Sequence, residues 1–139
     1  MVNEKVLFVC KYNVLRSKIG EAYLKKVRKD IEVRSAGVIA GGSELYENEK
    51  RILKSEGFVF SIGSNCLSKS LIDWADKIII VADNVPKKIF EDKNSENSKK
   101  VIVWEIKDSF LGASDETVKE IINQITSKVD KVFGGKNGK

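Results

Sequence analysis

The chain has 139 residues, of which 42% are hydrophobic, and its 25 basic and 20 acidic residues give a formal net charge of +5. This length suits one domain, no apolar stretch is long enough to span a membrane, and the start lacks the pattern of a signal peptide, so a cytoplasmic protein is expected. Two widely separated cysteines, Cys10 and Cys66, and the absence of histidine argue against a disulfide framework and a metal site, and no cofactor is expected.

The first half of the chain predicts two strands, each followed by a helix. Residues 5–9 form an apolar run typical of a buried strand, and the residues after Ser17 carry apolar side chains at helical spacing. A short second strand is predicted over 31–34. Ser43 is expected to cap the next helix, which ends near Gly57.

The second half continues the alternation of strands and helices. A short helix is predicted within 66–76, and strands are predicted over 77–82 and 101–104. The Ile-Ile-Ile-Val run of the third strand is apolar on both faces, as parallel sheets covered on two sides require. The last helix is expected to begin at Ser114. Its apolar stripe consists of Val118, Ile121, Ile122, Ile125, Val129 and Val132.

This order predicts an α/β fold, a small doubly wound four-stranded parallel sheet flanked by helices on both faces. We expect one domain over residues 1–133 and a flexible tail over 134–139. Ligands of such sheets bind at the carboxyl ends of the strands. Cys10 follows the first strand, Asp83 follows the third, and Asp108 comes shortly after the fourth, so all three are expected to converge on one crevice.

The loop after the first strand is the most informative segment, because Cys10 and Arg16 enclose five residues and Ser17 follows. A loop of this length before a helix leaves backbone N–H groups pointing inward, with the positive end of the helix dipole behind them. The Arg16 fork matches two oxygens of a phosphate, and the same field favours the nucleophilic thiolate of Cys10. The segment therefore predicts an N-terminal phosphate-binding loop and phosphoryl transfer through a phosphocysteine. The substrate-binding residues of the loop are predicted to be Lys11, Tyr12, Asn13, Val14, Leu15 and Ser17.

The chain resembles the low-molecular-weight protein tyrosine phosphatases, a family related to the thioredoxin-coupled arsenate reductases. The resemblance rests on Val6-Leu7-Phe8-Val9-Cys10-x-x-Asn13-x-x-Arg16-Ser17-x-x-x-Glu21-Ala22, on Ser35-Ala36-Gly37, on residues 75–84 and on Asp108-Ser109-Phe110. It implies a hydrolase, a cysteine-dependent protein phosphatase that cleaves phosphotyrosine or aryl phosphate monoesters and releases inorganic phosphate. It covers nearly the whole chain.

The resemblance also implies roles for individual residues. Asn13 organises the loop, Ser17 hydrogen-bonds the thiolate, and Asp108 is the general acid that protonates the leaving group. Phe110 stands where the family has Tyr or Trp and packs against the substrate ring. The implied partners are a phosphotyrosine protein or a small aryl phosphate, with no nucleic acid and no membrane, and the protein is expected to be a monomer.

Several residues depart from the family pattern. Tyr12 occupies a position that is usually Gly, Lys18 replaces Pro, Gly20 replaces Ala, and Ser109 replaces the Pro after the general acid. Leu15 replaces a frequent second cysteine, so a protective disulfide within the loop cannot form. Substrate preference is therefore expected to differ from that of typical members.

Other functions are compatible with parts of this pattern. An arsenate reductase on the same fold needs further cysteines, but none follows the third strand through Lys100. A non-catalytic module that binds phosphate or phosphoproteins is a second alternative, favoured by Tyr12 and Ser109. A phosphocysteine carrier of sugar-transport type lacks the arginine of this loop. The Lys-rich composition also suggests nucleic-acid binding, but no aromatic and basic stripe supports it.

Overall fold

The computed structural model describes residues 3–39, 45–60, 64–90, 99–107 and 114–134. No helix within these ranges is long and apolar enough to cross a membrane. The tail expected over residues 134–139 lies outside them, apart from Gly134. This glycine follows the last helix with a φ of 59°, the left-handed conformation in which a helix commonly ends.

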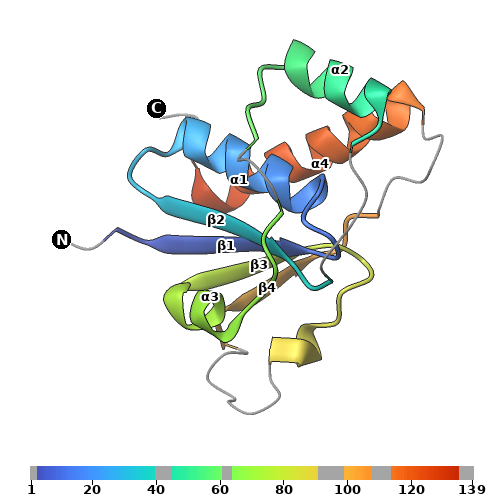
Figure 1. Ribbon diagram of the computed structural model, residues 1–139. Helices are drawn as coiled ribbons and strands as arrows, with labels where there is room; N and C mark the ends of the chain where they lie inside the picture. Colours follow the sequence, from blue (N-terminus) through green and yellow to red (C-terminus); the bar gives the residue numbers. More distant parts are fainter. Residues whose placement is uncertain (1–2, 40–44, 61–63, 91–98, 108–113, 135–139) are drawn as a thin grey trace.

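The sheet in the described residues has four strands, all parallel, in the order β2-β1-β3-β4 (Figure 1). The strands are β1 (Lys5–Cys10), β2 (Glu32–Gly37), β3 (Lys77–Val81) and β4 (Val101–Trp104). This confirms the predicted doubly wound parallel sheet. Because β2 lies on one side of β1 and β3 on the other, the carboxyl ends of β1 and β3 border the topological switch point, where ligands of such sheets bind.

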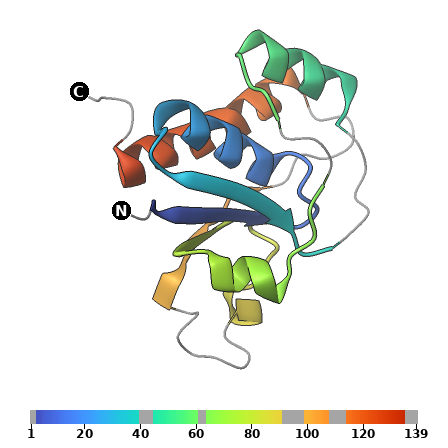
Figure 2. The same cartoon turned by 60° about the vertical axis from the view of Figure 1, so that its left-hand side comes forward.

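Helices cover both faces of the sheet (Figure 2). The helical segments are α1 (Arg16–Val27), α2 (Glu47–Ser55), α3 (Lys69–Trp74), the 3-10 helix η1 (Lys87–Phe90) and α4 (Asp115–Phe133). On one face α1 packs against α4, and α2 packs against α4 farther from the sheet. On the opposite face lie α3 and η1, so the prediction of helices on both faces is also confirmed.

The alternation of side chains along the central strands divides the core into two layers. The layer beneath α1 and α4 contains Val6, Phe8, Ile79 and Val81, and the layer beneath α3 contains Leu7, Val9, Ile78 and Ile80. All of these side chains are fully buried. Continuous apolar runs in β1 and β3 therefore serve two faces at once, as expected for central parallel strands.

Some details differ from those predicted from the sequence. β2 extends to Gly37, beyond the predicted end at residue 34, because it pairs with β1 as far as Cys10. The helix α2 begins at Glu47 rather than after Ser43, which lies outside the described residues. In α4 the predicted stripe was wrong at its end. Val132 is 42% exposed, and Phe133, four residues after Val129, is buried in its place.

The glycine that departs from the family pattern in α1 has a packing explanation. A Cβ atom at Gly20 would lie 2.6 Å from a ring carbon of Phe8, which is fully buried in β1. No side chain can occupy that space unless the ring moves, and the close packing of the core leaves little room for that. The large ring in the strand and the missing methyl group in the helix are therefore complementary.

Candidate active site

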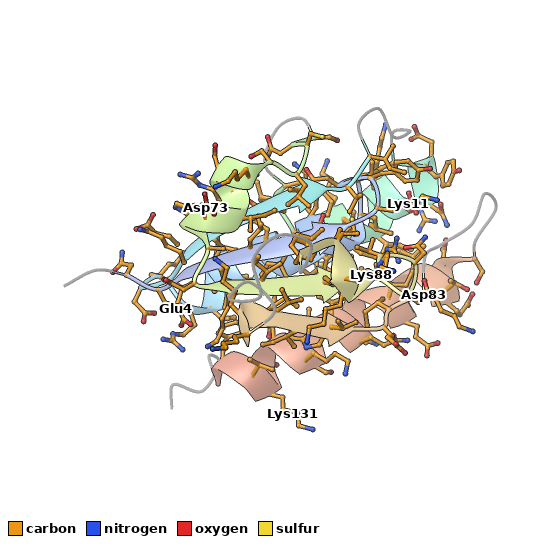
Figure 3. The ribbon with its side chains drawn as sticks, turned by 90° about the horizontal axis from the view of Figure 1, so that it is seen from below. Glu4, Lys11, Asp73, Asp83, Lys88 and Lys131 are labelled. Carbon is orange, nitrogen blue, oxygen red and sulfur yellow. The ribbon has the colours of Figure 1, made fainter. Side chains whose placement is uncertain are left out.

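The loop predicted to bind phosphate joins β1 to α1 at the carboxyl end of the sheet. Figure 3 shows Lys11 and Asp83 at this end of the molecule and Glu4 at the opposite end. Cys10 is the last residue of β1, and α1 begins at Arg16. The backbone N–H groups of the first turn of α1 therefore face the loop, together with the positive end of the helix dipole.

The backbone of the loop is held in an uncommon shape. Asn13 has a φ of 60°, in the left-handed region that asparagine tolerates better than most residues. The end of β2 passes close beneath it, and a Cβ at Gly37 would lie 2.7 Å from the Asn13 nitrogen. Only glycine permits this approach. The chain after Gly37 then bonds the loop, with the Val38 N–H donating to the Cys10 carbonyl oxygen over 3.1 Å.

The side chain of Asn13 connects the loop to its surroundings and is fully buried. Its Nδ2 donates to Ser17 Oγ over 2.8 Å and to Ser35 Oγ over 2.9 Å. Its Oδ1 accepts from the backbone N–H of Asn65 over 2.7 Å. These bonds join the loop to α1, to β2 and to the segment before α3, which is the geometry expected of a residue that organises the loop.

The thiol group of Cys10 lies at the base of the loop, and the residue is 2% exposed. Its Sγ is 3.1 Å from Ser17 Oγ and 3.3 Å from the backbone nitrogen of Asn13, which donates to it. The Asn13 N–H and the Ser17 hydroxyl therefore both lie within hydrogen-bond distance of the sulfur, at the N-terminal end of α1. The surroundings of Cys10 are therefore those of a nucleophilic cysteine.

The guanidinium group of Arg16 is also buried. Its Nη1 donates to the carbonyl oxygen of Ile106 over 2.8 Å and lies 3.7 Å from Asp83 Oδ1, and its Nη2 donates to Asn84 Oδ1 over 3.3 Å. These contacts from the ends of β3 and β4 fix the plane of the guanidinium. A planar fork held in one orientation suits the bidentate binding of an oxyanion.

Several of the groups that surround the loop are not predicted by the sequence. Asn84 and the Ile106 carbonyl orient Arg16, and Ser35 and Asn65 hold Asn13. The place of Asn84 directly after Asp83, at the end of a central strand, was a usable signal. The carbonyl of Ile106 left none, because every residue carries such a group.

The remaining predicted site residues occupy different surroundings. Lys11 and Tyr12 lie on the partly exposed side of the loop, with Lys11 Nζ 5.3 Å from the centre of the Tyr12 ring, and Val14 is also partly exposed. Leu15 packs into the hydrophobic core beneath α1. The predicted general acid Asp108, with Ser109 and Phe110, lies outside the described residues.

Lys18 occupies the position at which the family usually has proline, and its side chain is buried. Burial lowers the pKa of Lys18, whereas Glu21 nearby acts in the opposite direction. A buried ammonium group therefore belongs to the first turn of α1, immediately after the loop. Glu21 is also buried and accepts a hydrogen bond from Lys25 over 2.9 Å.

Together, this geometry defines a class of protein. The Cys10 sulfur accepts a hydrogen bond from the Asn13 N–H, lies beside the Ser17 hydroxyl, and stands at the base of a loop that leads into a helix with a buried arginine at its start. This is the arrangement of a cysteine-dependent phosphatase. The family model described as "Low molecular weight phosphotyrosine protein phosphatase" matches residues 5–136. The chain belongs to this family, as the resemblance of its opening motif predicts.

Similar proteins include phosphatases with different stated substrates. A protein-arginine-phosphatase from Geobacillus stearothermophilus is 40% identical over 77 residues, a match that spans 54% of this chain and only about half (52%) of that relative. The structure of an arginine phosphatase from the same organism has a TM-score of 0.79 and 28% identity, and the match covers 93% of this chain and 90% of that one. A low-molecular-weight protein tyrosine phosphatase from T. tengcongensis has a TM-score of 0.80 and 25% identity, with coverage of 95% and 99%.

Proposed function

We propose that this protein hydrolyses phosphotyrosine in proteins, or small aryl phosphates, through a phosphocysteine on Cys10. The observation that carries the proposal is the pair of hydrogen-bonding groups at the Cys10 sulfur, the Asn13 N–H, which donates over 3.3 Å, and the Ser17 hydroxyl oxygen at 3.1 Å. A cysteine held in this way is a nucleophile and, in the second step, a good leaving group. The proposal includes a monomer that acts without nucleic acid or membrane partners.

In the first step the Cys10 thiolate attacks phosphorus, and the bond from phosphorus to the phenolic oxygen breaks. Arg16 and the N–H groups of the loop bind the three non-bridging oxygens, on which charge is spread in the transition state. The departing phenolate takes a proton from the carboxyl group of Asp108. In the second step water attacks phosphorus, Asp108 accepts its proton, and the sulfur leaves as a thiolate that the Ser17 hydroxyl stabilises.

The role of Asp108 is tested by the dependence of rate on the leaving group. Proton donation matters most for a poor leaving group, so Asp108→Asn should slow hydrolysis of phenyl phosphate about a hundredfold or more, within the usual range of acid catalysis. Hydrolysis of p-nitrophenyl phosphate should suffer less. Equal losses on both substrates, or no loss on either, would assign the acid to another residue, with Glu105 and Asp83 as candidates.

Phosphoarginine is a second candidate substrate, because the relative that is 40% identical over 77 residues is a protein-arginine-phosphatase. The same nucleophile serves both reactions, since a thiolate can displace a guanidine nitrogen from phosphorus if an acid protonates that nitrogen. The substrates differ in what leaves, a flat aromatic ring or a long polar side chain. Specificity should therefore depend on the mouth of the loop, where Lys11, Tyr12 and Val14 lie partly exposed.

The two substrates are compared with peptides of one sequence that carry either phosphotyrosine or phosphoarginine at the same position. We expect phosphate release in EDTA and inhibition by vanadate, with the ratio of the two kcat/KM values naming the preferred substrate. If kcat/KM is larger for the phosphoarginine peptide, phosphoarginine rather than phosphotyrosine is the main substrate. Binding of either peptide without release of phosphate would show a non-catalytic module instead.

A further inference from the structure

A chain of buried hydrogen bonds extends from the Cys10 sulfur to the carboxylate of Glu21. Glu21 lies in α1, one turn after Ser17, and is 5% exposed. Its Oε1 accepts a hydrogen bond from Ser35 Oγ over 2.6 Å, and its Oε2 accepts from Lys25 Nζ over 2.9 Å. Ser35 Oγ in turn accepts from Asn13 Nδ2. The carboxylate is therefore linked to the phosphate-binding loop through a single serine.

The direction of each hydrogen bond in this chain can be assigned from chemistry. The backbone N–H of Asn65 can only donate, so the atom of Asn13 that faces it at 2.7 Å is the oxygen, and the NH₂ group faces Ser17 and Ser35. Both serine oxygens therefore accept from Asn13. The hydroxyl hydrogen of each serine is left for its other partner.

Those other partners lie at the two ends of the chain. An ionised carboxylate only accepts, so Ser35 donates to Glu21. Ser17 has its hydroxyl 3.1 Å from Cys10 Sγ, and because it already accepts from Asn13 it is oriented to donate to the sulfur. If Ser35 had no acceptor, its hydroxyl would rotate to seek one, and Asn13 would lose a partner that holds its amide group in place.

We propose that Glu21 is a positioning residue of this active site, which accepts the hydrogen of Ser35 and thereby fixes Asn13 so that Ser17 donates to Cys10. The inference deepens the proposed function, because it rests on Cys10 as the nucleophile. Glu21 acts through other residues and does not touch the substrate. A negative charge does not help a site that binds anions, so the hydrogen bond to Ser35 explains the buried carboxylate better than its charge does.

Charge and hydrogen bonding make opposite predictions for the removal of Glu21. A negative charge near a thiol disfavours the thiolate, so loss of the Glu21 charge by itself would make Cys10 more reactive, and the ammonium group of Lys18, which interacts electrostatically with Cys10, would reinforce this. Loss of the acceptor for Ser35 leaves Asn13 less firmly held, so that Ser17 donates less well to the sulfur and Cys10 becomes less reactive. The sign of the change therefore distinguishes the two effects.

The test measures how fast iodoacetamide alkylates Cys10 below neutral pH in Cys66→Ser protein, with Glu21→Met, Glu21→Gln, Ser35→Ala and the Glu21→Met/Ser35→Ala double variant. Loss of a hydrogen bond to a charged group typically changes the equilibrium between thiol and thiolate about tenfold, and loss of a bond that acts through other residues changes it less. Glu21→Met and Ser35→Ala should therefore each slow alkylation about threefold to tenfold. The double variant should be no slower than either single one, because both break one chain. Glu21→Gln keeps an acceptor and should largely restore the rate.

Lys25→Met is the matched control, because it removes a hydrogen bond to the other carboxylate oxygen and leaves the chain to Cys10 intact. Its alkylation rate should stay near that of the parent. Alkylation that is unchanged or faster in Glu21→Met, or additive losses in the double variant, would overturn the proposal. If Glu21→Met fails to fold, a normal rate in Ser35→Ala alone overturns it. Because iodoacetamide is neutral and needs no turnover, this test is independent of the proposed phosphatase activity.

Discussion

The two ends of the sheet carry similar polar groups in very different surroundings. At the carboxyl end Asn13, Arg16 and Ser17 are buried. Asn13 and Arg16 are held by partners from distant parts of the chain, and Ser17 is bonded to Asn13. At the amino end Glu4 and Lys77 pair over 2.8 Å with their side chains 35% and 39% exposed. Figure 3 shows Glu4 at this second end, away from Lys11 and Asp83.

This difference explains why polar side chains can form an active site at one end of the sheet and contribute little to stability at the other. A buried polar group without a partner costs far more than an exposed one, so the carboxyl end tolerates few arrangements and its groups stay in fixed positions. An exposed ion pair contributes little, because water replaces either partner. We therefore expect substitutions at the two ends to differ greatly in effect.

Replacement of the nucleophile should give the largest effect. Cys10→Ser leaves a hydroxyl that the loop cannot ionise at neutral pH, and turnover should fall by several orders of magnitude while binding of vanadate persists. Cys66→Ser is the matched control, since Cys66 is exposed and lies outside the loop. It should retain nearly full activity on p-nitrophenyl phosphate. Activity of Cys10→Ser within about tenfold of the parent would remove Cys10 from the mechanism.

Replacement of Arg16 should give the second-largest loss of turnover. Arg16→Lys keeps the positive charge but not the two parallel donors, and it leaves Asn84 and the Ile106 carbonyl without their fixed partner. We expect kcat to fall about a hundredfold or more, the scale found when a positioned transition-state donor is lost, and inhibition by phosphate and vanadate to weaken. Inhibition constants equal to those of the parent would mean that charge alone binds the oxyanion.

Stability should respond strongly to the buried asparagine. Asn13→Ala removes its side-chain hydrogen bonds and places alanine at a φ of 60°, so the free energy of unfolding should fall by about 3 to 5 kcal/mol. Asn13→Gly loses the same bonds but accepts the left-handed conformation, and it should be less destabilised by about 1 to 2 kcal/mol. Urea unfolding measures both. Equal losses in the two variants would show that the backbone conformation is not strained.

The smallest effect is expected from an exposed ion pair at the amino end of β2. Arg28 hydrogen-bonds Asp30 over 2.7 Å and lowers the pKa of Asp30 to about 2. A carboxylate with a lowered pKa stabilises the fold above its ordinary pKa of 3.8, and this contribution is lost as the pH falls through about 2. Asp30→Asn should therefore unfold slightly more easily than the parent at neutral pH, and the difference should vanish near pH 2. A difference that persists in acid would point to a cause other than this charge.

The sequence predicted the fold well because the signals were local. Three apolar runs and a short strand at 31–34, separated by segments with helical spacing, indicated a parallel sheet. The run at 77–82 is apolar on both faces, and both of these faces are covered in the structure. The ends of elements were less predictable. Pairing with β1 prolongs β2 to Gly37, and the exact turn of α4 decides that Phe133 rather than Val132 is buried. Both outcomes depend on neighbours that are distant in the sequence.

The site was predictable to the extent that its residues form one continuous segment. The segment from Cys10 to Ser17 predicts the nucleophile, the loop and the arginine together, because all of them lie within eight consecutive residues. Asn84, Ser35 and Asn65 come from other elements and join the loop only after folding. The assignment of Asp108 as the acid stays a prediction. The buried carboxylate of Glu21 matched the family motif, but only the hydrogen bonds indicate what it does.

The central claim is that phosphate is transferred to the sulfur of Cys10 before it reaches water. The most direct measurement is mass spectrometry of the protein quenched during turnover of p-nitrophenyl phosphate, followed by sequencing of the peptide that contains Cys10. We predict the added mass of one phosphoryl group on Cys10, absent before substrate is added and absent from Cys10→Ser at the same time point. Turnover without such an adduct on any time scale, or an adduct on a different residue, would contradict the account.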